Sequence, residues 1–118
     1  MSDAGRDPPE AELRARYERG ELGYQVTCRG KPVFPPRLRA PGGGGELRWE
    51  TSTGAGEVFA TTVVHRRGED PRNLAIVELD EGFRMMSRVV GCPPEKVRIG
   101  MRVQVEFERD SVPVFRPA

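Results

Sequence analysis

Alternating hydrophobic and polar residues predict a series of β-strands in the second half of the chain. Between Met101 and Phe107 every second residue is apolar, and this period of two is the clearest strand signal in the sequence. Ala75, Val77 and Leu79 alternate in the same way and are expected to share one face of a strand. The five strands expected from such patterns are 57–65, 74–80, 83–90, 101–107 and 112–115.

The connection between the third and fourth of these strands carries a helical signal. In Cys92-Pro-Pro-Glu-Lys-Val97 two prolines stand in the first positions of a short helical turn. Five strands with one short helix in that place follow the order of the OB-fold barrel. Gly54 and Gly56 precede the first strand and predict a β-bulge where the barrel opens. No helix is expected after them, so they do not form a phosphate-binding loop.

A helix is predicted near the N-terminus, after a polar tail of seven residues. Asp7 is expected to cap it, Pro8 to take its first position, and Glu10 to complete a capping box. Gly20 can end it. Because its apolar stripe is thin, two interpretations stay open: a marginal surface helix, or a helix that docks on another protein.

Between the helix and the barrel, residues 27–49 have the layout of a zinc ribbon without its ligands. Short strands are expected at 24–28 and 46–51, with a proline-rich segment and the flexible loop Gly42–Gly45 between them. Structural zinc needs four Cys or His ligands, which usually come in C-x2-C pairs. Cys28 is the one cysteine here, so we expect no zinc and interpret Cys28 as a vestigial ligand, packed as a small apolar group.

An ordered series of motifs resembles the zinc-ribbon/OB-fold accessory proteins that accompany thiolase-like enzymes acting on acyl-CoA. The likeness covers roughly residues 22–118. Its motifs are Phe34-Pro-Pro-Arg37, Gly54-Ala-Gly-Glu-Val58, Thr62-Val-Val-His65, Ala75-Ile-Val-Glu-Leu-Asp-Glu-Gly82, Arg84-Met-Met-Ser87, Val90-Gly-Cys92, Ile99-Gly-Met-Arg-Val103 and Pro113-Val-Phe-Arg-Pro117.

The resemblance implies a tail and helix over 1–22, a degenerate rubredoxin-like zinc ribbon over 23–50 and an OB-fold domain over 51–118. The overall class is mainly β. It also implies a non-catalytic subunit of a hetero-oligomer whose partner is a thiolase, acyltransferase or retro-aldolase, in settings that include steroid side-chain breakdown. The ribbon would dock on the partner, and the barrel would border the acyl-CoA channel. The chain departs from the family in its ribbon, so the family's zinc is not carried over and no cofactor is expected.

Composition and charge limit the classes of partner that the chain is expected to bind. The chain has 118 residues and a net charge of +1, with 19 basic and 18 acidic residues and 7% aromatic residues. A groove for single-stranded nucleic acid would be basic and lined with stacking aromatics, so an oligonucleotide-binding OB-fold protein is the alternative that these numbers disfavour. The apolar runs are too short for a membrane span, the N-terminus is too polar for a signal peptide, and a cytoplasmic location is expected.

Two sets of residues are candidates for binding. Phe34, Arg37, Leu38 and Trp49 lie on a segment too small to bury them, and such clusters are typical of protein interfaces. The alternative is that they pack onto the barrel. The pair Arg66-Arg67 could hold CoA phosphates through bidentate contacts, or could belong to a solvated loop whose charges partly cancel.

No catalytic set is recognisable in the sequence. His65, the sole histidine, has no nucleophile or orienting acid nearby in sequence. Asp80 and Glu81 are adjacent, so on a strand they would point to opposite faces, and a role in a turn is simpler. Cys92 before its helical turn is expected to be buried and structural rather than reactive. An enzyme acting alone on a thioester is therefore a third, disfavoured interpretation.

Overall fold

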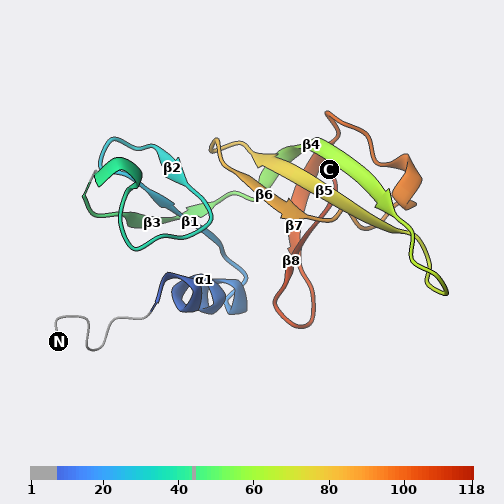
Figure 1. Cartoon of the computed structure of the whole chain (residues 1–118), viewed down its shortest axis with the longest axis horizontal. Coiled ribbons are helices and arrows are strands. Elements are labelled where there is room, and N and C mark those ends of the chain that lie inside the picture. The colour runs from blue at the N-terminus through green and yellow to red at the C-terminus, as the bar shows by residue number, and fades with distance from the viewer. Residues whose placement is uncertain (1–7, 44) are drawn as a thin grey trace.

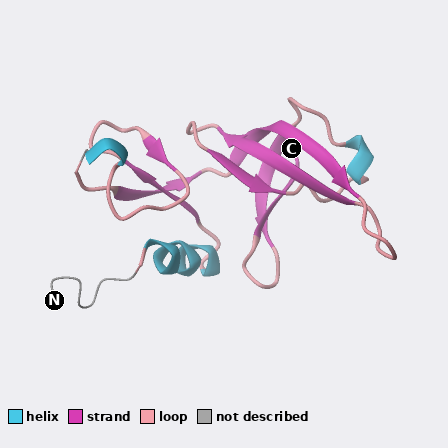
Figure 2. Ribbon diagram, in the orientation of Figure 1, coloured by secondary structure: helices cyan, strands magenta, loops and turns pink. Residues whose placement is uncertain are grey.

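The computed structural model describes residues 8–43 and 45–118, which fold into two β-sheets and a helix (Figure 1). The first sheet has three strands in the order β2-β1-β3, and the second has five in the order β6-β5-β4-β7-β8. The elements are α1 (Pro9–Glu18), β1 (Leu22–Val26), β2 (Pro32–Val33), η1 (Pro41–Gly43), β3 (Arg48–Ser52), β4 (Ala55–Val64), β5 (Arg72–Leu79), β6 (Arg84–Ser87), η2 (Pro94–Lys96), β7 (Arg102–Phe107) and β8 (Pro113–Pro117). Figure 2 shows the predominance of strands that the sequence pattern predicts.

The five-stranded sheet is the predicted OB-fold barrel. Its strands pair antiparallel, and a parallel bridge between Val89 and Phe115 links the segment after β6 to β8. The short helix η2 lies between β6 and β7, as the prolines after Cys92 predict. Ala75, Val77 and Leu79 all point into the core, which confirms the predicted alternation.

The predicted bulge lies elsewhere in the first barrel strand. The register of β4 against β5 shifts between Val58 and Ala60, not at the glycines. Gly56 is needed for another reason: a Cβ there would lie 2.5 Å from the backbone oxygen of Glu78. Gly54 has a φ of +82° and lies tightly against Val105, so it also makes room for a close approach of strands.

The helix begins one residue later than the capping motif predicts. Pro8 is the N-cap residue and not the first helical residue, and no side chain among the described residues caps the helix. Asp7 lies outside the described residues, so the capping box that it would form with Glu10 stays a prediction. The helix ends before Gly20, whose φ is +76°, and the i,i+4 pair Glu12–Arg16 is formed at 2.9 Å. The guanidinium of Arg16 lies 5.1 Å from the centroid of the Trp49 ring, and this contact places α1 against the first sheet.

The three-stranded sheet and its loops, residues 22–52, are called the ribbon below. Its first strand begins two residues earlier than predicted, and all five residues of β1 are buried. Cys28 then falls in the turn after β1 and is exposed, so the expectation that it packs as an apolar group is wrong. The prolines limit β2 to two residues at the edge of the sheet.

A buried glutamine fixes the loop that follows β2. The Nε2 of Gln25 donates to the carbonyl oxygen of Arg37 at 2.8 Å, and its Oε1 accepts the Arg37 N–H at 2.7 Å. Gln25 is 4% exposed. A side-chain amide in the core of the sheet thus anchors the backbone of the loop in two directions.

The ribbon and the barrel share one hydrophobic core. Leu22, Tyr24 and Val26 of β1 belong to the same buried cluster as Val77 and Phe115 of the barrel. Phe83, in the turn between β5 and β6, stacks on Tyr24 with ring centroids 4.7 Å apart and on Phe34 at 5.2 Å.

Polar contacts reinforce this junction at the same turn of the barrel. Glu81 accepts a hydrogen bond from the Ser52 hydroxyl at 2.6 Å and another from the Thr53 N–H at 2.9 Å. Its neighbour Asp80 accepts two bonds from Arg102, at 2.8 and 3.0 Å, which hold the pKa of Asp80 below its usual value. Both carboxylates therefore fasten the turn to neighbouring segments.

Within the described part of the chain, no helix has the length and apolar character needed to cross a bilayer.

We predict that Gln25→Leu lowers the free energy of unfolding by about 1–3 kcal/mol, because it leaves the N–H and carbonyl of Arg37 without their partner. Urea denaturation measures this change. Gln104→Leu is the matched control, since Gln104 is exposed and donates to a single carbonyl, that of Thr53. Its expected cost is about 0.5 kcal/mol. Equal losses in the two variants would contradict the anchoring role of Gln25.

Candidate functional site

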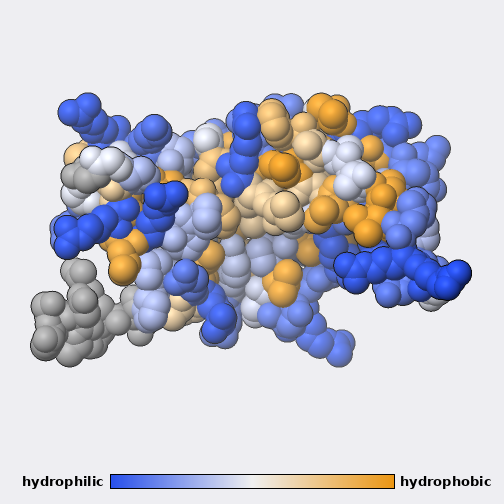
Figure 3. Space-filling model, in the orientation of Figure 1, coloured by the Kyte–Doolittle hydropathy of each residue, from blue (hydrophilic) through white to orange (hydrophobic). Residues whose placement is uncertain are grey.

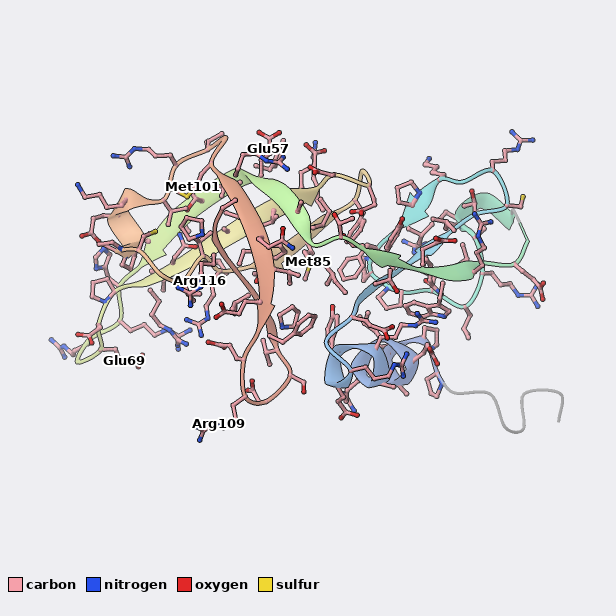
Figure 4. All side chains as sticks on the ribbon, turned by 180° about the vertical axis from the view of Figure 1, so that it is seen from behind. Glu57, Glu69, Met85, Met101, Arg109 and Arg116 are labelled. Atoms are coloured by element: carbon pink, nitrogen blue, oxygen red, sulfur yellow. The ribbon has the colours of Figure 1, made fainter. Side chains whose placement is uncertain are left out.

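A groove of about 530 Å³ lies between the β5–β6 edge of the barrel and β8. The helix contributes Tyr17 and the ribbon contributes Phe34, so both parts of the chain border it. The other lining residues are Val64, Arg66, Arg72, Asn73, Leu74, Met85, Met86, Ser87, Arg88, Val112, Pro113 and Val114. In Figure 4, Glu69 and Arg109 mark the tips of the β4–β5 and β7–β8 hairpins, which project from the barrel on this side.

The walls of the groove are mostly apolar, because the strands that form it carry apolar residues on both faces. On β5, Ala75 points inward and Leu74 points outward, with 38% of its surface exposed. On β6, Met85 is buried and Met86 is 67% exposed. Val112, in the turn before β8, is 43% exposed. Figure 3 shows hydrophobic residues gathered over this side of the barrel.

The floor of the groove contains one buried polar side chain, which is fully occupied by the fold. Asn73 donates to the Thr61 hydroxyl at 2.8 Å and accepts the Val89 N–H at 2.8 Å. It therefore ties β4, β5 and the segment after β6 together. With its amide engaged in this way, Asn73 is a structural residue and offers no free group for catalysis.

Among the described residues, three arginines and no carboxylate line the groove. Arg88 is bound to Glu108 at 2.6 Å. Arg66 and Arg72 are exposed, and neither forms an ion pair with any of the residues that the structure describes. The groove thus combines apolar walls with unneutralised positive charge.

The four residues predicted to bind a partner divide into two groups. Phe34 packs on Phe83, and Trp49 lies half-buried beneath Arg16, so these two serve the fold. Leu38 is 78% exposed and Arg37 has an exposed side chain. Packing onto the rest of the fold therefore accounts for two of the four, and Arg37 and Leu38 are the two that the ribbon exposes to solvent.

The predicted phosphate-binding pair is also divided. Arg66 lines the groove, whereas Arg67 is exposed on the hairpin and does not line it. His65 is exposed as well, and none of the side-chain hydrogen bonds among the described residues involves it. Cys92 is half-buried and packs against the core. No nucleophile and base come together at these positions.

The ribbon does not fit a zinc ion. Within residues 8–43 and 45–118, no three His, Cys, Asp or Glu side chains are grouped so that they could hold a metal. Cys28 is exposed in its turn, and Gln25 occupies the interior of the sheet. A ribbon without zinc remains a prediction, and no role is assigned to a metal below.

The apolar residues that line the groove were not predicted as site residues, although a pattern in the sequence indicates them. The segment Leu74-Ala-Ile-Val-Glu-Leu79 places apolar residues on both faces of its strand, and Met85-Met86 does the same. In a small barrel only one face can be buried inside. A strand that is apolar on both faces therefore predicts an outer surface suited to contact with another molecule.

Comparison with known proteins places the chain among OB-fold proteins of one family. The family described as "ChsH2, C-terminal OB-fold domain" matches residues 49–108. The chain is 37% identical over 95 residues to a "DUF35 domain-containing scaffold protein" of Methanocaldococcus jannaschii, covering 75% of this chain and 67% of that protein.

Two further matches differ in how much of the other protein they cover. The chain is 39% identical over 84 residues to a "Probable enoyl-CoA hydratase alpha subunit" of Thermomonospora curvata, covering 63% of this chain but 26% of that protein. A chain in the solved structure of the "Ltp2-ChsH2(DUF35) aldolase" superposes with a TM-score of 0.80 and 28% identity, over 96% of this chain and 97% of that chain. The chain thus spans about a quarter of the bacterial subunit but nearly all of the structural match.

The burial of Tyr17, which lines the groove, has a measurable effect on its pKa. Its ring lies 5.8 Å from that of Phe107, and burial raises its pKa to about 12 because the charged phenolate is poorly solvated there. In the unfolded chain the pKa of tyrosine is about 10. The neutral phenol therefore contributes stability that is fully present below pH 10 and is lost as the pH rises toward about 12.

We predict that the melting temperature of the wild type falls more steeply between about pH 10 and pH 12 than that of Tyr17→Phe. Thermal melts of both proteins across this range measure the difference. Tyr24 is present in both, so its own titration cancels. Parallel pH profiles would show that Tyr17 is not buried as described.

Proposed function

The chain belongs to the ChsH2 C-terminal OB-fold family, and on this premise we propose that it is a non-catalytic accessory subunit of a thiolase-like enzyme acting on acyl-CoA. One observation carries the proposal: nearly the whole chain, ribbon included, superposes on a chain of the Ltp2-ChsH2(DUF35) aldolase. The archaeal relative is named a scaffold protein, which favours a structural rather than a catalytic role.

The arrangement of side chains agrees with a subunit that leaves chemistry to its partner. The candidate catalytic groups, His65 and Cys92, lie apart from any activating neighbour that the described residues supply. The groove is instead apolar with a positively charged lining. Such a surface can stabilise another protein or border a substrate channel, but it supplies no proton acceptor or nucleophile of its own.

In this proposal the ribbon docks on the enzyme through its exposed loop. Leu38 is the most exposed large hydrophobic residue of the described chain, and Gln25 fixes the backbone of the loop beside it. A loop whose backbone is already fixed loses little conformational freedom on binding, which suits an interface anchor. Phe34 and Trp49 act indirectly, by holding the ribbon in shape.

We predict that co-expression with the thiolase-like enzyme of its own organism yields a complex on gel filtration, and that the enzyme alone is less soluble or turns over more slowly. Leu38→Glu is expected to weaken the complex by at least about 1 kcal/mol, as truncation of an anchor does. Ile99→Glu is the control, since Ile99 is 71% exposed on the barrel. An enzyme that is fully stable and active alone, and forms no complex with the wild type, would refute the proposed function.

A direct contact with CoA is a finer proposal. Arg66 and Arg67 stand side by side on an exposed hairpin and have no ion-pair partners in the described structure, so both are available to phosphate oxygens.

For the assembled complex we predict that Arg66→Gln/Arg67→Gln raises KM for an acyl-CoA several-fold while leaving KM for the matching acyl-pantetheine unchanged. Acyl-pantetheine lacks the phosphates, so it isolates their contribution. Arg98→Gln, on the loop before β7, is the control. Equal changes with both substrates would argue against phosphate binding.

A further inference from the structure

The outer face of the barrel next to the groove also carries exposed apolar side chains. Ile76 pairs with Ala60 on one side and with Met86 on the other, so these three residues form a row across β4, β5 and β6. Phe59 lies next to this row under the guanidinium of Arg84, 3.6 Å from the ring centroid, and is still 43% exposed. Figure 3 shows hydrophobic side chains gathered over the barrel in this view. We call Phe59, Leu74, Ile76, Met86 and Val112 the apolar face.

The extent of the apolar face favours a polypeptide as its occupant. A groove of about 530 Å³ has the size of a small-molecule site. Phe59 and Ile76, however, lie outside the groove lining, and a ligand seated in the groove would leave them exposed. Monomeric proteins seldom expose contiguous apolar patches unless another protein covers them. A chain segment laid along the groove and over the sheet would cover both.

Charge indicates the chemistry of that segment. Arg72 stands beside Leu74 at the start of β5. Among the residues that the structure describes, Arg72 has no ion pair and no Asp or Glu lines the groove. A second copy of this chain, packed by two-fold symmetry, would set one arginine-lined groove against another, and the described lining residues of neither copy would supply a carboxylate. The complementary occupant is therefore apolar and acidic.

We propose that the apolar face and the groove bind an apolar segment of the partner enzyme that carries a carboxylate for Arg72. The proposal rests on the accessory function proposed above and adds a second contact, on the barrel, to that of the ribbon. Arg66 is not required for this contact, so it stays available to a phosphate.

The test measures the affinity of the purified chain for the co-expressed thiolase-like enzyme. Met86→Glu places a charge in the middle of the apolar face and is expected to raise Kd at least tenfold. Arg72→Glu is expected to raise Kd about tenfold and to flatten the dependence of Kd on salt, because it removes an attraction that salt screens. Ile99→Glu and Arg98→Glu are matched controls of similar exposure outside the groove lining. Both are expected to leave Kd unchanged.

The outcomes separate this inference from the function on which it rests. If the wild type does not bind the enzyme, the accessory function itself fails. If the wild type binds and the Met86 and Arg72 variants bind equally well, the inference is wrong and the ribbon alone docks. If these variants keep the complex but lose affinity for CoA, or if they abolish a dimer of the chain alone, the groove has another occupant and the inference is again wrong. Circular dichroism and melting curves establish that the exposed substitutions leave the fold intact.

Discussion

The stacking of Phe83 between the ribbon and the barrel is the contact on which the rest of the structure depends. Phe83 comes from the β5–β6 turn of the barrel and lies against Tyr24 at 4.7 Å and Phe34 at 5.2 Å, both from the ribbon. Aromatic pairs of this kind contribute about 0.5–1.5 kcal/mol each beyond their burial. They are formed where the hydrophobic core passes from one sheet to the other. The ribbon is thus held by packing against its neighbour, in a chain whose described residues offer no metal cluster to hold it.

The groove inherits its shape from this junction. Tyr17 and Phe34 reach it from the N-terminal part of the chain, and Leu74, Met86 and Val112 reach it from the barrel. Each part alone would supply one wall. A shared core therefore has a functional consequence, because the surface offered to a partner is continuous from the helix to the β4–β5 hairpin.

Much of the fold could be predicted from the sequence because it depends on local patterns. The alternation up to Phe107 fixed one face of β7, and the two prolines after Cys92 fixed the position of η2. The start of the helix at Pro8 and the bulge near Gly54 were wrong for a physical reason. Glycine and proline report that the backbone is special at a position, but whether it bends, bulges or makes room for a neighbouring strand depends on distant residues such as Val105.

The candidate site was predicted less well, since exposure is a property of the assembled fold. Sequence alone could not show that Phe34 packs against Phe83 while Leu38 stays exposed. The strand prediction used the apolar residues that alternate on the core-facing side. It therefore did not single out Leu74 and Met86, which point outward. Yet a small barrel has one interior, so apolar residues on the second face of β5 and β6 add nothing to its core. In the isolated chain they face water without benefit to folding, which is the physical reason for proposing that they contact another molecule.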